Sequence, residues 1–214
     1  AGFLLGEAMI GRRADVLRIE PCAKNEFGNT IDVLLAPDVP VDFNRLTRNV
    51  FASSSCGICG KASIDSILQT LDPIESNVQF DATLITQLPA LMHAEQQTFH
   101  RTGGLHAAAL FGEDGKMIVL REDVGRHNAV DKVIGHALLN DLYPMDRHVL
   151  LVSGRSSFEI MQKALAARIP IVAAVSAPSS LAASFAETSG QTLIGFLREG
   201  RMNIYTHRDR IRLV

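Results

Sequence analysis

Residues 148–175 read HVLLVSGRSSFEIMQKALAARIPIVAAV, and this segment determines the fold class that we predict. The apolar run at 148–152 has the length of a buried strand, and residues 158–168 repeat apolar side chains at helical spacing. Residues 169–175 form a second apolar run of strand length. A strand, a helix and a strand in this order favour two parallel strands with the helix packed across them. The segment therefore predicts an α/β fold.

The same alternation continues on both sides of this segment. We expect a hairpin of strands 105–111 and 117–120, helices at 128–139 and 179–187, a strand at 191–197 and a closing hairpin through 202–206. The N-terminal part is less regular, with a hairpin of strands 17–20 and 30–35 and a helix at 84–97, in which Pro89 introduces a kink or shifts the start of the helix. These expectations divide the chain into a β-containing part at 1–43, a mobile loop region at 44–82 and an α/β domain at 83–214.

The composition is that of a globular protein with a sizeable core and little net charge. Of the 214 residues, 47% are hydrophobic, and 21 basic against 23 acidic side chains leave a net charge of −2. This balance argues against binding nucleic acid or an anionic membrane through the overall field. No apolar run approaches the ~20 residues that span a bilayer. Three cysteines and an opening without the basic flank of a signal peptide lead us to expect a reducing cytoplasm.

The strongest local motif is the Cys-x-x-Cys pair of Cys56 and Cys59, which glycines flank and three serines precede. Four interpretations compete: two buried side chains, half of a zinc site, a thioredoxin-like redox pair, and a thiol that carries sulfur as a persulfide. The polar neighbours disfavour burial, and the three serines stand where a thioredoxin-like site would have a strand. The histidines that could complete a zinc site are His93, His100 and His106. The motif alone does not rank redox chemistry against sulfur transfer.

A second signal comes from three strand-to-helix turns. These turns are residues 120–128, 152–157 and 177–180. We expect them at one carboxyl edge of the sheet, where α/β proteins bind ligands and helix N-termini favour phosphate. Two of them carry a Gly-Arg pair, with Arg126 and Arg155, and arginine binds phosphate through paired hydrogen bonds. Ser156 and Ser179 as simple helix caps are the plainer interpretation of any single turn, but the two Gly-Arg turns together favour an anion site.

The C-terminal residues 198–214 hold five arginines against Glu199 and Asp209. A solvent-exposed basic segment is the simpler interpretation; a phosphate-rich ligand, with Phe196 or Tyr205 stacked on a purine, is the more specific one. The chain has neither a Walker A loop nor a dinucleotide-binding fingerprint. Zinc deaminase chemistry is disfavoured, because the cysteine pair precedes His106 and no glutamate follows that histidine at the required spacing.

Four motifs, taken in this order, resemble the FdhD family of accessory sulfurtransferases of formate dehydrogenase. They are SSCGICG at 54–60, TGGLHAA at 102–108, EDVGRHNAVDK at 122–132 and SGRSSFEI at 153–160. The resemblance covers essentially the whole chain, with residues 2–7 similar to a segment that lies inside family members. It implies a three-layer fold similar to cytidine deaminase, with a mixed central sheet, and a homodimer.

The resemblance also implies a reaction. Such a protein takes sulfur from a cysteine desulfurase as a persulfide on Cys56, with Cys59 as the second cysteine. It passes the sulfur to the molybdenum cofactor, bis(molybdopterin guanine dinucleotide), before that cofactor enters formate dehydrogenase. The resemblance implies that the molybdenum cofactor binds as a substrate and that the protein holds no metal ion of its own. The family's cofactor-binding run falls on Phe196, Leu197, Arg198, Glu199, Gly200 and Arg201.

Arg126 and Arg155 suit the phosphates of the same ligand. A thiol-disulfide oxidoreductase and a zinc- or nucleotide-binding scaffold remain the alternatives.

Overall fold

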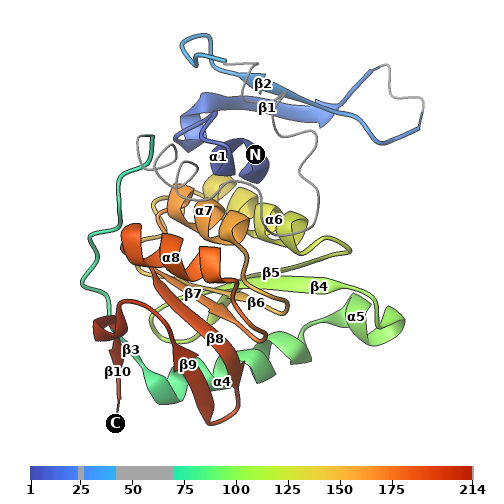
Figure 1. Ribbon diagram of the computed structural model, residues 1–214. Helices are drawn as coiled ribbons and strands as arrows, with labels where there is room; N and C mark the ends of the chain where they lie inside the picture. Colours follow the sequence, from blue (N-terminus) through green and yellow to red (C-terminus); the bar gives the residue numbers. More distant parts are fainter. Residues whose placement is uncertain (24–26, 42–69, 214) are drawn as a thin grey trace.

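The structure is a computed structural model that describes residues 1–23, 27–41 and 70–213 (Figure 1). Cys56 and Cys59 lie outside these described residues, as does most of the predicted loop region. At the centre of the described part is a mixed six-stranded sheet in the order β5-β4-β6-β7-β8-β9. Its strands are β4 (His106–Phe111), β5 (Met117–Asp123), β6 (Val149–Val152), β7 (Ile171–Ala174), β8 (Thr192–Arg198) and β9 (Arg201–Ile204).

The direction of the strands brings four carboxyl ends to one edge. Strands β6, β7 and β8 are parallel neighbours, as the pattern of residues 148–175 predicts. Strand β4 lies antiparallel between β5 and β6, and β9 pairs antiparallel with β8. Strand β5 therefore runs in the same direction as β6, and the carboxyl ends of β5, β6, β7 and β8 share an edge with the start of β4. The mixed sheet implied by the family resemblance is confirmed.

Helices cover both faces of the sheet and make three layers (Figure 1). One face carries α6 (Arg126–Leu139), α7 (Phe158–Ala166) and α8 (Ser180–Thr188), and the other carries α4 (Ala82–Ala94) and α5 (Gln97–Thr102). Each interface has its own apolar core, with Val130 and Leu165 on the first side and Leu88 and Phe111 on the second. Because both faces are covered, every residue of β6 and β7 is buried.

The N-terminal residues form a further layer outside α6 and α7. Helix α1 (Gly2–Gly6) packs against both of them and places Leu5 in their core. The hairpin of β1 (Val16–Pro21) and β2 (Ile31–Leu35) lies beyond α1 and confirms the pairing predicted for residues 17–20 and 30–35. The remaining elements are β3 (Phe80–Asp81), β10 (Ile211–Arg212), and the 3-10 turns η1 (Arg13–Asp15) and η2 (Arg208–Arg210). The domain limits at 43 and 82 stay a prediction.

The helix predicted at 84–97 is two helices. Helix α4 keeps Pro89 in its interior and ends at Ala94, so this proline neither starts nor ends a helix. Gln96 leaves helical geometry, with φ −77° and ψ 66°, before α5 begins. Helix α5 then ends at Gly103, whose φ of 69° is a left-handed conformation that glycine adopts without steric cost. Helix α5 has fewer than two turns, too short for a periodic pattern to reveal it.

Within the described ranges, no helix combines the length and the apolar character that crossing a bilayer requires.

Candidate functional site

A pocket of about 680 Å³ opens at the carboxyl edge of the sheet, on the side covered by α4 and α5. Its volume lies within the range of ~300–1,000 Å³ that is typical of small-molecule sites. Its walls come from the two helices, the loop that leads into β4, and the ends of β6, β7 and β8. The lining includes Met92, His93, Gln96, Phe99, His106, Ser153, Val175, Leu197, Arg198 and Glu199.

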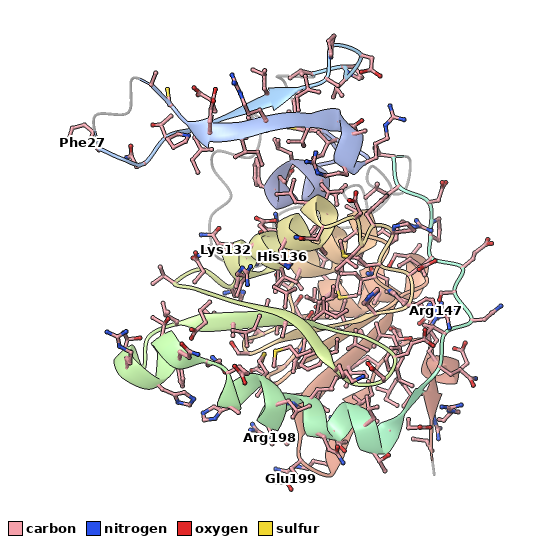
Figure 2. All side chains as sticks on the ribbon, turned by 180° about the vertical axis from the view of Figure 1, so that it is seen from behind. Phe27, Lys132, His136, Arg147, Arg198 and Glu199 are labelled. Atoms are coloured by element: carbon pink, nitrogen blue, oxygen red, sulfur yellow. The ribbon has the colours of Figure 1, made fainter. Side chains whose placement is uncertain are left out.

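Three of the six residues in the predicted cofactor-binding run line this pocket. Leu197 is buried in the core beneath it, and Arg198 and Glu199 are exposed at its mouth. Figure 2 shows Arg198 and Glu199 where β8 turns into β9, close to α4. The run therefore reaches the pocket through its central residues.

The other three residues of the run lie beside the pocket. Phe196 has a left-handed φ of 51° where the β8–β9 pairing is irregular, and 41% of its surface is exposed. Gly200 forms the turn to β9 with a φ of 72°, and the exposed Arg201 begins that strand. These residues follow the pocket mouth along the turn.

Glu122 at the end of β5 holds α5 in place as one wall of the pocket. Its carboxylate accepts hydrogen bonds from the backbone N–H groups of Thr98 (2.9 Å) and Phe99 (2.7 Å) at the start of α5. Burial alone would raise the pKa of Glu122, but these two amide donors outweigh it and the pKa is lowered. An anion at a helix N-terminus also suits the helix dipole.

Asp123 organises the turn between β5 and α6. One oxygen accepts from the Gly125 amide (2.8 Å) and the Asn128 side chain (3.1 Å), and the other lies 2.6 Å from the Lys132 ammonium, which Figure 2 labels. Against the opposing effect of burial, these donors lower the pKa of Asp123. The ionised carboxylate thus fixes the backbone that presents Arg126.

Arg126 and His106 both pack against the Gly154 backbone in the next turn. A Cβ atom at Gly154 would lie 3.3 Å from His106 Nδ1 and 3.6 Å from Arg126 Cδ. Arg126 Nε is buried without a hydrogen-bond partner among the residues that the structure describes. Arg155 follows Gly154 and is exposed. The two Gly-Arg turns therefore place their arginines at the edge where His106 enters the pocket.

His127 lies behind this edge as a neutral imidazole. Its Nε2 is 2.8 Å from Ser157 Oγ, and the Glu159 carboxylate lies 3.6 Å away. Burial, and then the charges of Arg126, Lys163 and His106, lower the pKa of His127 to about 4. At neutral pH this histidine adds no charge to the cationic edge.

A buried ion cluster connects α6 and α7 beneath the same turn. Lys163 is 1% exposed, and its ammonium donates to both oxygens of Asp131, at 2.8 and 3.1 Å. Glu159 and Glu7 lie 3.8 and 3.9 Å from the same ammonium. Burial raises the pKa of Asp131, although Lys163 acts in the opposite direction. The cluster also ties α1, through Glu7, to the two helices.

The serines of the turns act largely as structural residues. Ser179 caps α8, with its Oγ accepting from the Ala182 amide at 3.1 Å, as the simpler interpretation predicts. The N-cap of α7 is Ser157 and not Ser156, which is buried and donates to Met161 Sδ at 3.6 Å. The second and third turns lie side by side, since the Ser179 amide donates to the Ser156 carbonyl at 3.0 Å.

The histidines considered for zinc do not form a metal site within the described part of the chain. His93 and His100 stack edge to face with centroids 4.7 Å apart, and His93 and His106 line the same pocket. No group of three or more His, Cys, Asp or Glu side chains suited to a metal ion occurs among the described residues. A site that uses Cys56 or Cys59 falls outside them.

Sequence reasoning missed the pocket wall formed by Gln96, Phe99 and Ser153. Gln96 lies at a break inside the helix predicted at 84–97, and Phe99 lies on α5 beyond the end of that predicted helix. Ser153 was recognised only as part of a turn. Its Oγ accepts from the Ala107 amide at 2.9 Å and joins the start of β4 to the end of β6.

A three-layer α/β fold with a ligand-sized pocket at the carboxyl edge defines a class of small-molecule-binding proteins. The model of the FdhD/NarQ family matches residues 1–212, and the chain belongs to this family.

Relatives and a solved structure agree with this assignment. The chain is 50% identical over 222 residues to "Sulfur carrier protein FdhD" of Streptomyces coelicolor, covering all of this chain and 78% of that protein. It is 44% identical to the protein of the same name from Thermoplasma volcanium, covering 98% of this chain and 76% of that protein. The crystal structure of a "putative formate dehydrogenase accessory protein" from Desulfotalea psychrophila matches with a TM-score of 0.75 and 25% identity, covering 99% of this chain and 77% of the other. The three-layer mixed fold is thereby confirmed, and the likeness to cytidine deaminase stays a prediction.

Proposed function

We propose that this chain is a sulfur carrier in formate dehydrogenase maturation. It accepts sulfur on Cys56 from a cysteine desulfurase and delivers it to bis(molybdopterin guanine dinucleotide), which binds as substrate at the pocket. The observation that carries the proposal is membership of the FdhD/NarQ family, whose relatives are named sulfur carrier proteins. A cytoplasmic location and a homodimer belong to the same proposal.

The proposed chemistry is two thiol exchange steps. In the first, the Cys56 thiolate attacks the outer sulfur of a cysteine persulfide on the desulfurase; the donor S–S bond breaks and the donor leaves as a thiolate. In the second, the Cys59 thiolate attacks Cys56 Sγ and expels the terminal sulfur as sulfide to the acceptor. The sulfane sulfur is reduced as the two cysteines are oxidised to a disulfide, which a cellular dithiol then reduces.

The pocket edge supports binding of a large anionic ligand. Arg198 lies at the mouth, and Arg126 and Arg155 lie on the adjoining turns. Arginine guanidinium groups pair with phosphate oxygens through two hydrogen bonds, and the uncapped start of α6 adds partial positive charge. Phe196 and Tyr205, both more than two-fifths exposed, offer rings near the same edge for stacking.

The test of sulfur transfer is the mass of the intact protein after incubation with a cysteine desulfurase and cysteine. Wild type should gain sulfur, and Cys56→Ala should gain none. Cys22→Ala is the matched control, because Cys22 is a half-buried free cysteine at the end of β1 and should leave loading unchanged. Equal loading of wild type and Cys56→Ala would refute the role of Cys56.

The same samples separate the alternatives. A reversible Cys56–Cys59 disulfide that reduces a model substrate, without sulfur loading, would indicate a disulfide oxidoreductase. Stoichiometric zinc in the purified protein would indicate a metal-bound scaffold.

A further inference from the structure

A second pocket, of about 550 Å³, lies between the N-terminal layer and the outer side of α7. None of the described residues lines both this pocket and the one at the carboxyl edge, which is on the other side of the sheet. Its wall is mainly apolar and includes Leu5, Met9, Ile10, Val39, Leu71 and Tyr143. A cavity of this size and lining can receive an apolar side chain of another protein.

The rim of this second pocket is acidic. Its charged lining residues are Arg12, Asp15 and Asp38, one guanidinium against two carboxylates. Burial acts to raise the pKa of Asp15, but hydrogen bonds from the Gly11 amide (2.7 Å) and from Arg12 outweigh it and lower this pKa. Asp38 lies 3.6 Å from the same Arg12 guanidinium, and its side chain is 71% exposed. The rim therefore suits a partner that carries a cation next to its apolar group.

The part of the chain that holds both cysteines begins and ends beside this pocket. Residues 42–69 connect Val41 to Thr70, and Cys56 stands at the middle of this connection. Pro40, next to Val41, lines the pocket, and so does Thr70. Along the chain, the second pocket is thus the nearest part of the described fold to Cys56 from either direction.

The β1–β2 hairpin extends this surface, because Asp38 at the pocket rim follows β2 closely. One face of the hairpin packs against the core through Leu35 and Val33. The same face continues outward, where the hairpin projects past α1 (Figure 1), with Ile31 and Ile19 at 65% and 38% exposed. A stable complex buries about 800 Å² on each partner, more than one pocket offers, and this apolar face adds to it.

We propose that the second pocket and the adjoining hairpin, together the N-terminal surface, are where a cysteine desulfurase docks to load Cys56. An apolar side chain of the desulfurase enters the pocket, and a lysine or arginine beside it pairs with Asp38. The inference rests on the proposed function and names the surface that its first step uses. The proposed acceptor site is on the other side of the sheet, so donor and acceptor do not compete for one surface.

The first test compares two sulfur donors by the mass of the intact protein over time. One is a cysteine desulfurase with cysteine, and the other is glutathione persulfide, a small donor that needs no docking surface. Asp38→Lys reverses the charge of the rim and should slow loading by the desulfurase about tenfold, while loading by glutathione persulfide is unchanged. Asp209→Lys, the same charge change at an exposed position on η2, is the matched control. Equal slowing with both donors, or no slowing with the desulfurase, would overturn the inference.

The second test concerns the apolar face of the hairpin. The double variant Ile19→Thr, Ile31→Thr keeps branched side chains suited to a strand, and should weaken binding of the desulfurase by about tenfold. Ile118→Thr is the matched control, because Ile118 on β5 is 39% exposed and lies outside the N-terminal surface. Calorimetric titration measures the affinity. Unchanged affinity in the double variant would contradict the role of the hairpin.

The other possible occupants of this surface give different results. A change in the oligomeric state of the double variant, with unchanged loading by the desulfurase, would assign the surface to a second copy of the chain and overturn the inference. A wild-type protein that takes up sulfur from neither donor contradicts the sulfur-carrier role itself. Loading from both donors that is equal in wild type and in all variants contradicts only the docking surface.

Discussion

The pKa of His127 depends on burial and on the charged groups around the candidate site. Burial is the main cause of the lowered pKa of His127, and electrostatic interaction with Arg126 on α6, Lys163 on α7 and His106 at the start of β4 lowers it further. The Glu159 carboxylate at 3.6 Å does not offset these effects. Burial and the neighbouring positive side chains therefore keep His127 neutral at neutral pH.

This environment makes stability depend on pH. The pKa of His127 falls from its ordinary 6.5 to about 4 on folding, so between these values the unfolded chain binds a proton that the folded chain does not. The free energy of unfolding is therefore highest above pH 6.5 and decreases as pH falls towards 4, by about 2 kcal/mol for a partly exposed group.

Chemical denaturation at several pH values tests this dependence. His127→Gln keeps a hydrogen-bonding group opposite Ser157 but does not titrate, so its stability should fall less steeply from pH 6.5 to 4. The raised pKa of Asp131 acts in the opposite sense, and it is common to both proteins. If the free energy of unfolding fell equally steeply with pH in wild type and His127→Gln, His127 would not be the source of the pH dependence.

At the scale of elements, the segment at 122–132 connects several parts of the fold through its side chains. Glu122 caps α5, Asp123 shapes the turn, Arg126 faces Gly154, His127 contacts Ser157 and Asp131 pairs with Lys163. These contacts reach α5, the second Gly-Arg turn and α7, whereas those of Asp123 stay within its own turn and α6. One strand-to-helix connection thus sets the positions of α5, α7 and the second Gly-Arg turn.

The cap on α5 gives an element-level prediction. In Glu122→Gln, one carboxylate oxygen becomes an N–H donor, so one of the two amides, of Thr98 or of Phe99, loses its acceptor. This contact between β5 and the start of α5 is then weakened, and we expect the amides of Thr98 and Phe99 to exchange hydrogen about fivefold faster, equivalent to about 1 kcal/mol. Amide exchange followed by NMR measures this, with Glu113→Gln in the β4–β5 turn as a control. Unchanged exchange at Phe99 would show that α5 is held by its packing alone.

The sequence predicted those elements whose patterns are long or repeated. The strand–helix–strand of 148–175 was found because β6 and β7 are buried on both faces and are therefore apolar throughout. Helix α5 was missed because its position depends on Glu122, which is distant along the chain. The family resemblance implied a mixed sheet, but the antiparallel place of β4 between β5 and β6 was not predicted, since strand patterns carry no information on which neighbour a hairpin joins.

The sequence predicted only part of the site, because some of its residues belong to recognisable motifs and others are brought together only by the fold. Arg198 and Glu199 came from the resemblance and Arg126 from a turn motif, and all three lie at the pocket or its edge. Gln96 has no local signal in the sequence, because its place in the pocket wall depends on the break between α4 and α5. The roles of Cys56 and Cys59 stay a prediction, outside the described residues.

At the scale of the whole molecule, charge is distributed unevenly. The net charge is only −2, yet Arg126, Arg155, Arg198 and Arg201 all lie along the carboxyl edge of the sheet or the turn beside it. The net charge of the molecule is small, but positive charge is concentrated at this edge. This distribution favours binding of a small anionic ligand over binding of an extended polyanion. Binding at this edge involves β5, β6, β7 and β8 together, so it should stabilise the entire α/β fold.

Thermal unfolding with and without guanosine diphosphate tests this coupling. A ligand at 100 times its Kd stabilises the folded state by about 2.7 kcal/mol, which for a domain of this size raises Tm by roughly 5–10 °C. The double variant Arg198→Ala, Arg201→Ala should lose most of this shift, because it removes the two cations at the pocket mouth and the adjoining turn. Arg208→Ala, an exposed arginine on η2 away from the pocket, should keep it. An equal Tm shift in the double variant would place the nucleotide elsewhere and remove residues 196–201 from the site.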